Sequence, residues 1–259
     1  NSALELVCID IDASSSTYGQ LVAETTGLYN NGQLQKWAMS PDGNTAVVAK
    51  ILSDSLFVYD LNPASSTFLQ NSQILDVPAH NSSMLHLVTN VKYSSDGSEL
   101  FAAVQHAGVE NSEIGRYDVA AGVWIDHNPN VFGVQCLGDM SDPVLLTGSG
   151  AYGMDISDDL VLFISGPFVP FNGGGGNDDG WLSRVELTPL SGSGYSTVQY
   201  TGAVKDVHEV SLNHDQNVLA VGTPDSSTAH VTFFDSETLS FIGGTLLSGS
   251  RNIYQMHWR

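Results

Sequence analysis

The strongest constraint in this sequence is a repeat. A short apolar stretch, a Ser- or Asn-led turn containing Asp and a second apolar stretch occur together four times, and a fifth copy begins near the end of the chain. The copies start roughly 46 to 63 residues apart, at residues 37–43, 91–97, 154–159, 210–215 and 256–258. Repeats of this length are typical of propellers and other stacked folds.

Each complete copy predicts four strands. The apolar runs after the turns are residues 45–51, 99–104, 160–164 and 218–221. A third strand ends in each copy with a bulky apolar residue and an acid, at residues 59–60, 117–118, 185–186 and 234–235. A weaker fourth strand follows, as in residues 195–200. Four antiparallel strands joined by short turns form one propeller blade.

The two ends of the chain predict a fifth unit. Residues 4–10 are typical of a third strand, 18–22 of a fourth strand and 253–258 of a first strand. We therefore expect one all-β domain over residues 1–259, a β-propeller of about five four-stranded blades closed by both termini, which hides the sheet edges. Because no second strand remains for that last blade, the alternative is a fragment of a larger propeller.

Composition narrows the function. The chain has 28 Asp and Glu residues against 8 Lys and Arg residues, which gives a net charge of −20. Binding of nucleic acid needs clustered cations, so we expect no nucleic-acid partner. The sequence contains no apolar run of about 18 residues, so we expect no insertion into a membrane by a helix. Excess acid keeps a protein solvated, so we expect an extracellular, cell-surface or periplasmic location. Cys8 and Cys136 form one disulfide or stay as two buried thiols, and the sequence leaves both open.

A family resemblance supports the same fold. The turn at residues 40–43, the strand at 45–49 and the segment 56–61 resemble the repeats of lactonase-like propellers of the YVTN type. Residues 91–97 and 210–221 are similar to them in a more degenerate form. The resemblance implies a propeller. Because these repeats are longer and less even than those of the family, it implies no particular site.

Strand alternation assigns the faces of the first strands. We expect the apolar columns to pack between blades: Trp37, Met39, Val91, Tyr93, Met154, Ile156, Val210, Leu212, Met256 and Trp258. We expect the intervening polar residues to line a central channel: Lys36, Asn90, Lys92, Asp155, Glu209 and His257. This set is either a site for a small anion or substrate or an ion-pair network in a water-filled channel.

Histidines and one glycine-rich loop are the other candidates. His86, His106 and His208 are candidate ligands of a transition metal on one face, but their spacing is not diagnostic and scattered surface histidines explain them better. In the loop 165–180, Asp178 and Asp179 are candidate Ca²⁺ ligands. Its aromatic neighbours Phe168, Phe171 and Trp181 are candidate partner contacts, and the alternative is a disordered insertion.

The sequence favours a binding function over a catalytic one. No Gly-x-Ser-x-Gly or His-Glu-x-x-His motif occurs. We expect a secreted or surface-exposed module that binds a protein or a small polar ligand. The sequence establishes no cofactor beyond the candidate Ca²⁺ and transition-metal ligands named above. The alternative is an enzyme, a lactonase-like hydrolase or a metal-dependent oxidoreductase, with its site at the mouth of the channel.

Overall fold

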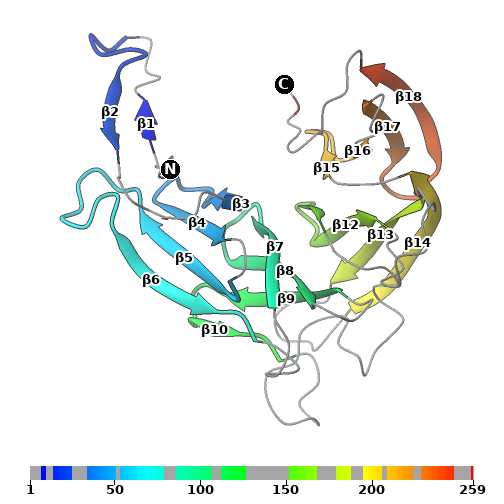
Figure 1. The fold of residues 1–259 in the computed structure, drawn as a ribbon, viewed down its shortest axis with the longest axis horizontal. Helices are drawn as coiled ribbons and strands as arrows, with labels where there is room; N and C mark the ends of the chain where they lie inside the picture. Colours follow the sequence, from blue (N-terminus) through cyan, green and yellow to red (C-terminus); the bar gives the residue numbers. More distant parts are fainter. Residues whose placement is uncertain are drawn as a thin grey trace.

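The computed structural model describes residues 7–9, 14–24, 34–50, 53–78, 86–106, 112–126, 152–167, 179–187, 195–205, 209–223, 229–247 and 258. The regular secondary structure of these residues consists of β-strands (Figure 1). They contain no helix that is long and apolar enough to cross a membrane.

Four of the sheets have four strands each. The first contains β3 (Leu34–Met39), β4 (Thr45–Lys50), β5 (Ser55–Asp60) and β6 (Asn71–Asp76). The second contains β7 (His86–Tyr93), β8 (Glu99–His106), β9 (Ser112–Asp118) and β10 (Val123–Trp124). The third contains β11 (Gly153–Ile156), β12 (Val161–Pro167), β13 (Asp179–Leu187) and β14 (Tyr195–Lys205). The fourth contains β15 (Glu209–Leu212), β16 (Val218–Thr223), β17 (Ala229–Asp235) and β18 (Phe241–Leu247).

Each sheet follows the chain order and pairs its strands antiparallel. The first strands β3, β7, β11 and β15 lie next to one another toward the centre, and the later strands lie progressively farther out (Figure 1). This arrangement confirms the prediction of an all-β fold built from repeated four-stranded units. It follows from the sequence because every connection within a repeat is shorter than the dozen or more residues that a crossover between parallel strands needs.

The described sheets form an open arc. β1 (Val7–Ile9) and β2 (Leu21–Glu24) pair antiparallel as a separate two-stranded sheet, as the third and fourth strands of a fifth blade would. Residues 253–257, which were expected to supply its first strand, lie outside the described residues. Trp258 is described, and its indole N–H donates to the carbonyl oxygen of Ser211 in the fourth sheet at 3.1 Å. The number of blades and the closure of the ring stay predictions.

The turn between the first and second strands explains why Ser and Asp recur. The Ser40 hydroxyl donates to the Asp42 carboxylate at 2.6 Å and accepts the Thr45 N–H at 3.0 Å. The second copy repeats both bonds, with Ser94 donating to Asp96 at 2.7 Å and accepting the Glu99 N–H at 3.0 Å. In the third copy Ser157 likewise accepts a backbone N–H. These side chains satisfy backbone groups that the reversal leaves without a ladder partner.

The fourth residue of each turn, counted from its Ser or Asn, has a left-handed backbone. Its φ is 72° at Gly43, 74° at Gly97, 59° at Leu160 and 58° at Gln216. The first two positions use glycine, for which this conformation carries no Cβ penalty. The last two hold it with ordinary side chains, which explains why the Asp-Gly pair is visible in only two of the four copies.

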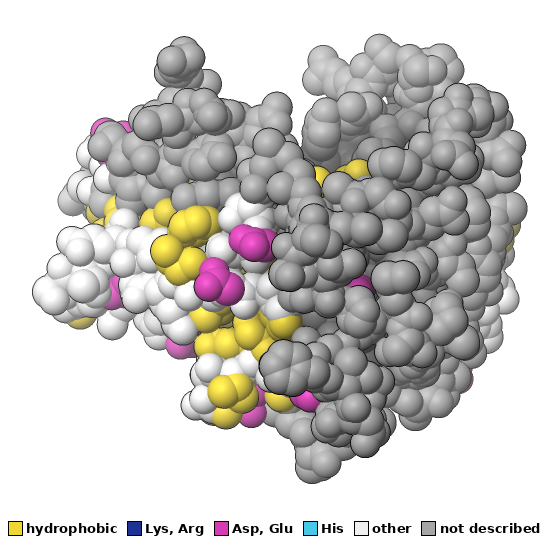
Figure 2. Space-filling model, turned by 60° about the horizontal axis from the view of Figure 1, so that its bottom comes forward, with side chains coloured by type: hydrophobic (Ala, Val, Ile, Leu, Met, Phe, Trp, Pro, Cys, Tyr) yellow, Lys and Arg dark blue, Asp and Glu magenta, His cyan; other side chains and the backbone are white. Residues whose placement is uncertain are grey.

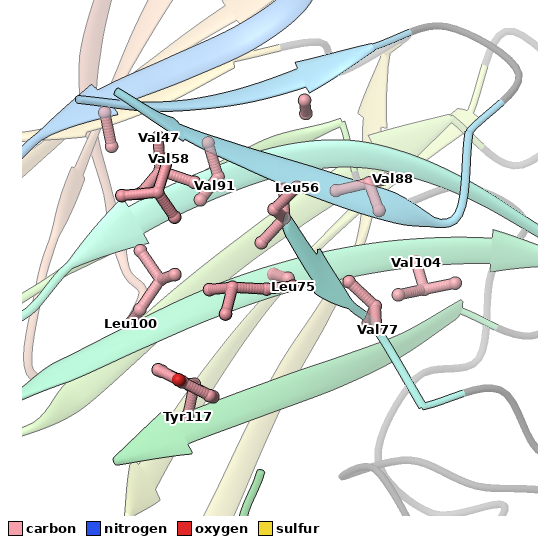
Figure 3. Packing of buried hydrophobic residues seen from close by; sticks show 13 residues of the cluster. Val47, Leu56, Val58, Leu75, Val77, Val88, Val91, Leu100, Val104 and Tyr117 are labelled. Atoms are coloured by element: carbon pink, nitrogen blue, oxygen red, sulfur yellow. The ribbon is translucent and has the colours of Figure 1, made fainter. Parts of the chain in front are cut away.

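The core lies between consecutive sheets. Val47, Leu56, Val91 and Leu100 belong to the cluster between the first and second sheets (Figure 3). A second cluster, which includes Met154, joins the second and third sheets, and a third cluster, which includes Val210, joins the third and fourth sheets. The predicted apolar columns are thus confirmed for these three junctions.

The first sheet departs from that prediction. Trp37 and Met39 occupy the column position of Val91 and Tyr93 but are 47% and 52% exposed. Their packing between blades was therefore predicted wrongly for this structure. The physical reason is that they lie on the opposite side of β3 from Ala38, which is buried in the cluster shared with the second sheet.

Candidate functional site

The first strands bring charged side chains from all four sheets together. The Lys36 ammonium of β3 pairs with the Glu209 carboxylate of β15. The Nζ atom of Lys92 on β7 lies 3.4 Å from Oδ1 of Asp155 on β11. We call Lys36, Asn90, Lys92, Asp155 and Glu209 the axial cluster. Two cations and two carboxylates balance within it.

Two members of the axial cluster also join neighbouring sheets. Asp155 accepts the backbone N–H of Leu212 in the fourth sheet at 2.7 Å. Asn90 is buried, and its amide nitrogen donates to the carbonyl oxygen of Tyr152 beside the third sheet at 2.6 Å. A hydrogen bond to a charged or buried group contributes about 1–3 kcal/mol. These two side chains therefore help to fix how the sheets sit against each other.

Glu209 has the most perturbed environment in the cluster. Its burial raises the pKa of its carboxyl, because a charge is costly where water is excluded. The positive charges of Lys36 and then Lys92 oppose that shift, while the carboxylate of Asp155 adds to it. A buried carboxyl with a raised pKa next to lysines is a group that can exchange a proton with a ligand.

Five of the six residues predicted to line a channel are thus neighbours around the inner strands. The sixth, His257, lies outside the described residues. Because the described sheets form an open arc, the role of this set as the lining of a closed channel stays a prediction. The interpretation as an ion-pair network and the interpretation as a binding site both fit the geometry.

A cavity of about 480 Å³ adjoins the axial cluster. It is lined by Trp37, Ala38, Met39, Pro41, Lys92, Tyr93, Ser94, Ser95, Asp155 and Ile156. Two aromatic side chains and several apolar ones thus surround one ion pair. Burial raises the pKa of the Tyr93 phenol, so Tyr93 is a neutral hydrogen-bonding group near neutral pH.

The cavity lies at the end of the sheets opposite to the loops that follow the second and fourth strands, which include the glycine-rich loop 165–180 proposed from sequence. Its residues come from the C-terminal ends of β3, β7 and β11 and from the turns that follow β3 and β7. In an antiparallel meander the loops after the second and fourth strands lie at the other end. Sequence reasoning missed this site because it looked for function in long loops. The available signal was Trp37, an aromatic residue in a column otherwise filled by Val and Met.

The candidate metal ligands are only partly placed. The register of β7 and β8 puts His86 directly opposite His106. His208 lies outside the described residues. Among the side chains that the structure describes, no group of three or more His, Cys, Asp or Glu residues could hold a metal ion. Metal binding by the predicted set therefore stays a prediction.

The glycine-rich loop gives one clear correction. Trp181 was predicted to contact a partner, but it is fully buried in the cluster between the second and third sheets. That prediction is wrong because β13 already begins at Asp179, so Trp181 belongs to a core strand. Phe168, Phe171 and Asp178 lie outside the described residues. Asp179 is opposite Lys205 in the register of β13 and β14.

Whether Cys8 and Cys136 form a disulfide stays open as well. Cys8 is opposite Ala23 in the β1–β2 pair, and Cys136 lies outside the described residues.

One described part of the surface, shown in Figure 2, carries Asp and Glu side chains next to apolar ones, with no Lys or Arg in view. This picture agrees with the excess of acids in the sequence.

Comparison with known proteins places the fold. The sequence matches no family model and no curated protein. The structure is similar to hydrazine synthase of Kuenenia stuttgartiensis, with a TM-score of 0.59 and 16% identity over 90% of this chain and 59% of that chain. A functionally unknown protein from Desulfotomaculum acetoxidans gives a TM-score of 0.59 and 12% identity over 96% of this chain and 65% of that chain.

A third similar structure is the Dos1 propeller, with a TM-score of 0.54 and 10% identity over 90% of this chain and 52% of that chain. This chain spans less than two thirds of the length of each of the three. At these identities the similarity concerns the fold alone, and the YVTN resemblance stays a prediction. The repeated four-stranded sheets, the inward first strands and these structural neighbours together show that the chain has a β-propeller-like fold.

Proposed function

We propose that this chain is a binding module whose ligand occupies the cavity beside the axial cluster. The observation that carries the proposal is the meeting of Trp37 and Tyr93 with the Lys92–Asp155 pair around about 480 Å³. Small-molecule sites are typically cavities of about 300–1,000 Å³ with mostly apolar walls and a few polar groups that orient the ligand.

The lining indicates the class of ligand. Trp37 and Met39 offer exposed apolar surface at the opening, and a flat ring can stack on an indole. The Lys92 ammonium has three hydrogens to donate, and its contact with Asp155 is 3.4 Å long. A small amphipathic molecule fits best, with a ring against Trp37 and a hydrogen-bond acceptor toward Lys92.

Ligand-observed NMR with a set of ring-containing fragments tests this proposal. We expect fragments that bind the wild-type protein to lose about tenfold or more in affinity in Trp37→Ala, because a stacked ring contributes about 1.4 kcal/mol or more. Ile74→Ala is the matched control, since Ile74 on β6 is 55% exposed and lies outside the cavity lining. Equal fragment binding by wild type and Trp37→Ala would overturn the proposal.

A hydrolase is the second proposal, and the observation that favours it is Glu209. A buried carboxyl with a raised pKa beside Lys36 has the properties of a general acid or base. Assays with simple lactones on wild type and Glu209→Gln decide between the two functions. Hydrolysis by the wild type that falls at least a hundredfold in the variant would support an enzyme, whereas inactive wild-type protein would remove this proposal.

Several finer points belong to the same proposal. A secreted or surface-exposed location is supported by the net charge of −20. Closure by a fifth blade is a competing use of the exposed column at Trp37, supported by the contact of Trp258 with Ser211, and a blade packed on that column would exclude ligand stacking there. A partner contact through Phe168 and Phe171, Ca²⁺ at Asp178 and Asp179 and a lactonase-like relationship rest on the sequence patterns alone.

A further inference from the structure

The hydrogen-bond acceptors in the cavity lining are already engaged by the protein itself. Asp155 is the carboxylate of the lining, and both of its oxygens accept backbone N–H groups. Oδ1 accepts from Ile156 at 3.1 Å, and Oδ2 accepts from Leu212 at 2.7 Å. The hydroxyl of Ser94, which also lines the cavity, donates to Asp96 at 2.7 Å. A ligand therefore finds few acceptors among these side chains.

Lys92 is the cation of the same lining, and its ammonium is loosely paired. Within the part of the chain that the structure describes, its ion pair is the contact of 3.4 Å with Asp155, whereas hydrogen bonds between charged groups are typically about 2.7–2.9 Å long. Lys36, by contrast, pairs closely with Glu209. The Lys92 side chain is 29% exposed, and an ammonium has three hydrogens to donate. Lys92 therefore has donor capacity left for a ligand.

The charges around Lys92 decide which kind of acceptor fits. A cationic group placed against Asp155 would also lie near the Lys92 ammonium, which would repel it. A doubly charged anion would be opposed by the carboxylates of Asp155 and Glu209, and Glu209 interacts electrostatically with both Lys92 and Asp155. A singly charged carboxylate avoids both penalties, and it accepts strong, charge-assisted hydrogen bonds from an ammonium.

We propose that the ligand of this cavity is a small aromatic monocarboxylate whose charge is bound by Lys92. The inference rests on the proposed function, which places the ring of the ligand against Trp37. Ser95 is exposed and lines the same cavity, so it adds a hydroxyl donor to the lining. Asp155, held by its two backbone N–H groups, positions the Lys92 ammonium at the cavity.

Three probes with the same ring system and different charges test this inference: naphthalene carboxylate, the matching carboxamide and the matching amine. In ligand-observed NMR titrations the wild type should bind the carboxylate at least tenfold more tightly than the other two probes, because a charge-assisted hydrogen bond is stronger than a neutral one. Lys92→Met should weaken binding of the carboxylate at least tenfold and change binding of the carboxamide less than twofold. Lys92→Arg keeps the charge and should retain a preference for the carboxylate.

Lys50→Met is the matched control, because it removes the same charge from the last residue of β4, at the other end of that strand from the turn beside the cavity. It should bind the carboxylate as the wild type does, and circular dichroism shows whether each variant folds. A folded Lys92→Met that keeps the preference for the carboxylate would overturn this inference.

The same titrations separate this inference from the proposed function. Equal affinity of the wild type for the carboxylate and the carboxamide, with binding that still depends on Trp37, would overturn the inference and leave the proposed function standing. Binding of none of the probes, or binding unaffected by Trp37→Ala, would overturn both.

Discussion

The same column of side chains has opposite surroundings in two parts of this molecule. In the second, third and fourth sheets, Val91, Met154 and Val210 are completely buried against the preceding sheet. In the first sheet the equivalent residue, Trp37, is 47% exposed. The repeat specifies which side chains leave each strand on a given face, whereas the burial of that face depends on whether another sheet packs against it.

The exposure of the column in the first sheet also bears on ligand binding. At the covered junctions Val91, Met154 and Val210 are packed without exposed surface, which leaves no room for a ligand at these positions. At the first sheet the uncovered column carries an aromatic and a methionine side chain, and these form part of the cavity wall. An unpaired blade face is therefore where this fold has surface available for binding.

The largest expected effect compares two methionines. Met154→Ala should lower the free energy of unfolding by about 2–5 kcal/mol, because Met154 is completely buried between two sheets. Met39→Ala should change it by only about 0.5 kcal/mol or less, because Met39 is 52% exposed. Urea unfolding of both variants measures the two values. A Met39→Ala cost close to that of Met154→Ala would mean that a fifth sheet covers the first, and the cavity would then be closed.

An intermediate effect compares two glycine turns. Gly43→Ala should destabilise by about 1 kcal/mol, because only the left-handed backbone opposes a Cβ there and no atom lies within 4 Å. Gly97→Ala should cost more, since its Cβ would also lie 3.2 Å from Cδ of Pro41 in the neighbouring first sheet. Gly243→Ala, with open space around its Cβ and no left-handed backbone, is the control in thermal unfolding. Equal costs at Gly43 and Gly97 would argue against contact between these turns.

The smallest expected effect concerns the charge in the exposed turn of the first sheet. Hydrogen bonds from the Ser40 hydroxyl and then from Asn44 lower the pKa of Asp42 to about 2. A lowered pKa contributes stability above the unfolded value of 3.8, and this contribution is lost as pH falls toward about 2. Asp42→Asn should therefore flatten the fall in unfolding midpoint between about pH 5 and pH 2.

The second turn provides the comparison for this prediction. Asp96 has its pKa lowered by the Ser98 N–H and the Ser94 hydroxyl, so Asp96→Asn should act in the same direction. The pH dependence of Glu209 has the opposite sign, because its pKa is raised in the folded state. Its contribution to the free energy of unfolding is therefore lost as pH rises through the pKa of the folded state. Unchanged acid sensitivity in both turn variants would show that these hydrogen bonds do not persist in solution.

The sequence by itself determined the strands, the turns and the faces. Ser40 and Asp42 predicted a reversal because their side chains bond the local backbone, and Lys36 and Glu209 were assigned to the inner strands by alternation alone. These features depend on residues close in sequence, whose geometry is set by the period of a strand. The interaction of Lys36 with Glu209, 173 residues later in the chain, extends that local pattern to a long-range contact.

Only the tertiary structure decided which surfaces are covered. Trp181 was predicted as a loop aromatic but is buried, Trp37 was predicted as a core aromatic but is exposed, and His86 is opposite His106 only through the register of two strands. Burial and cross-strand register depend on neighbours far away in sequence. A pattern with a period of two residues states the direction of a side chain, and it contains no information about what packs against it.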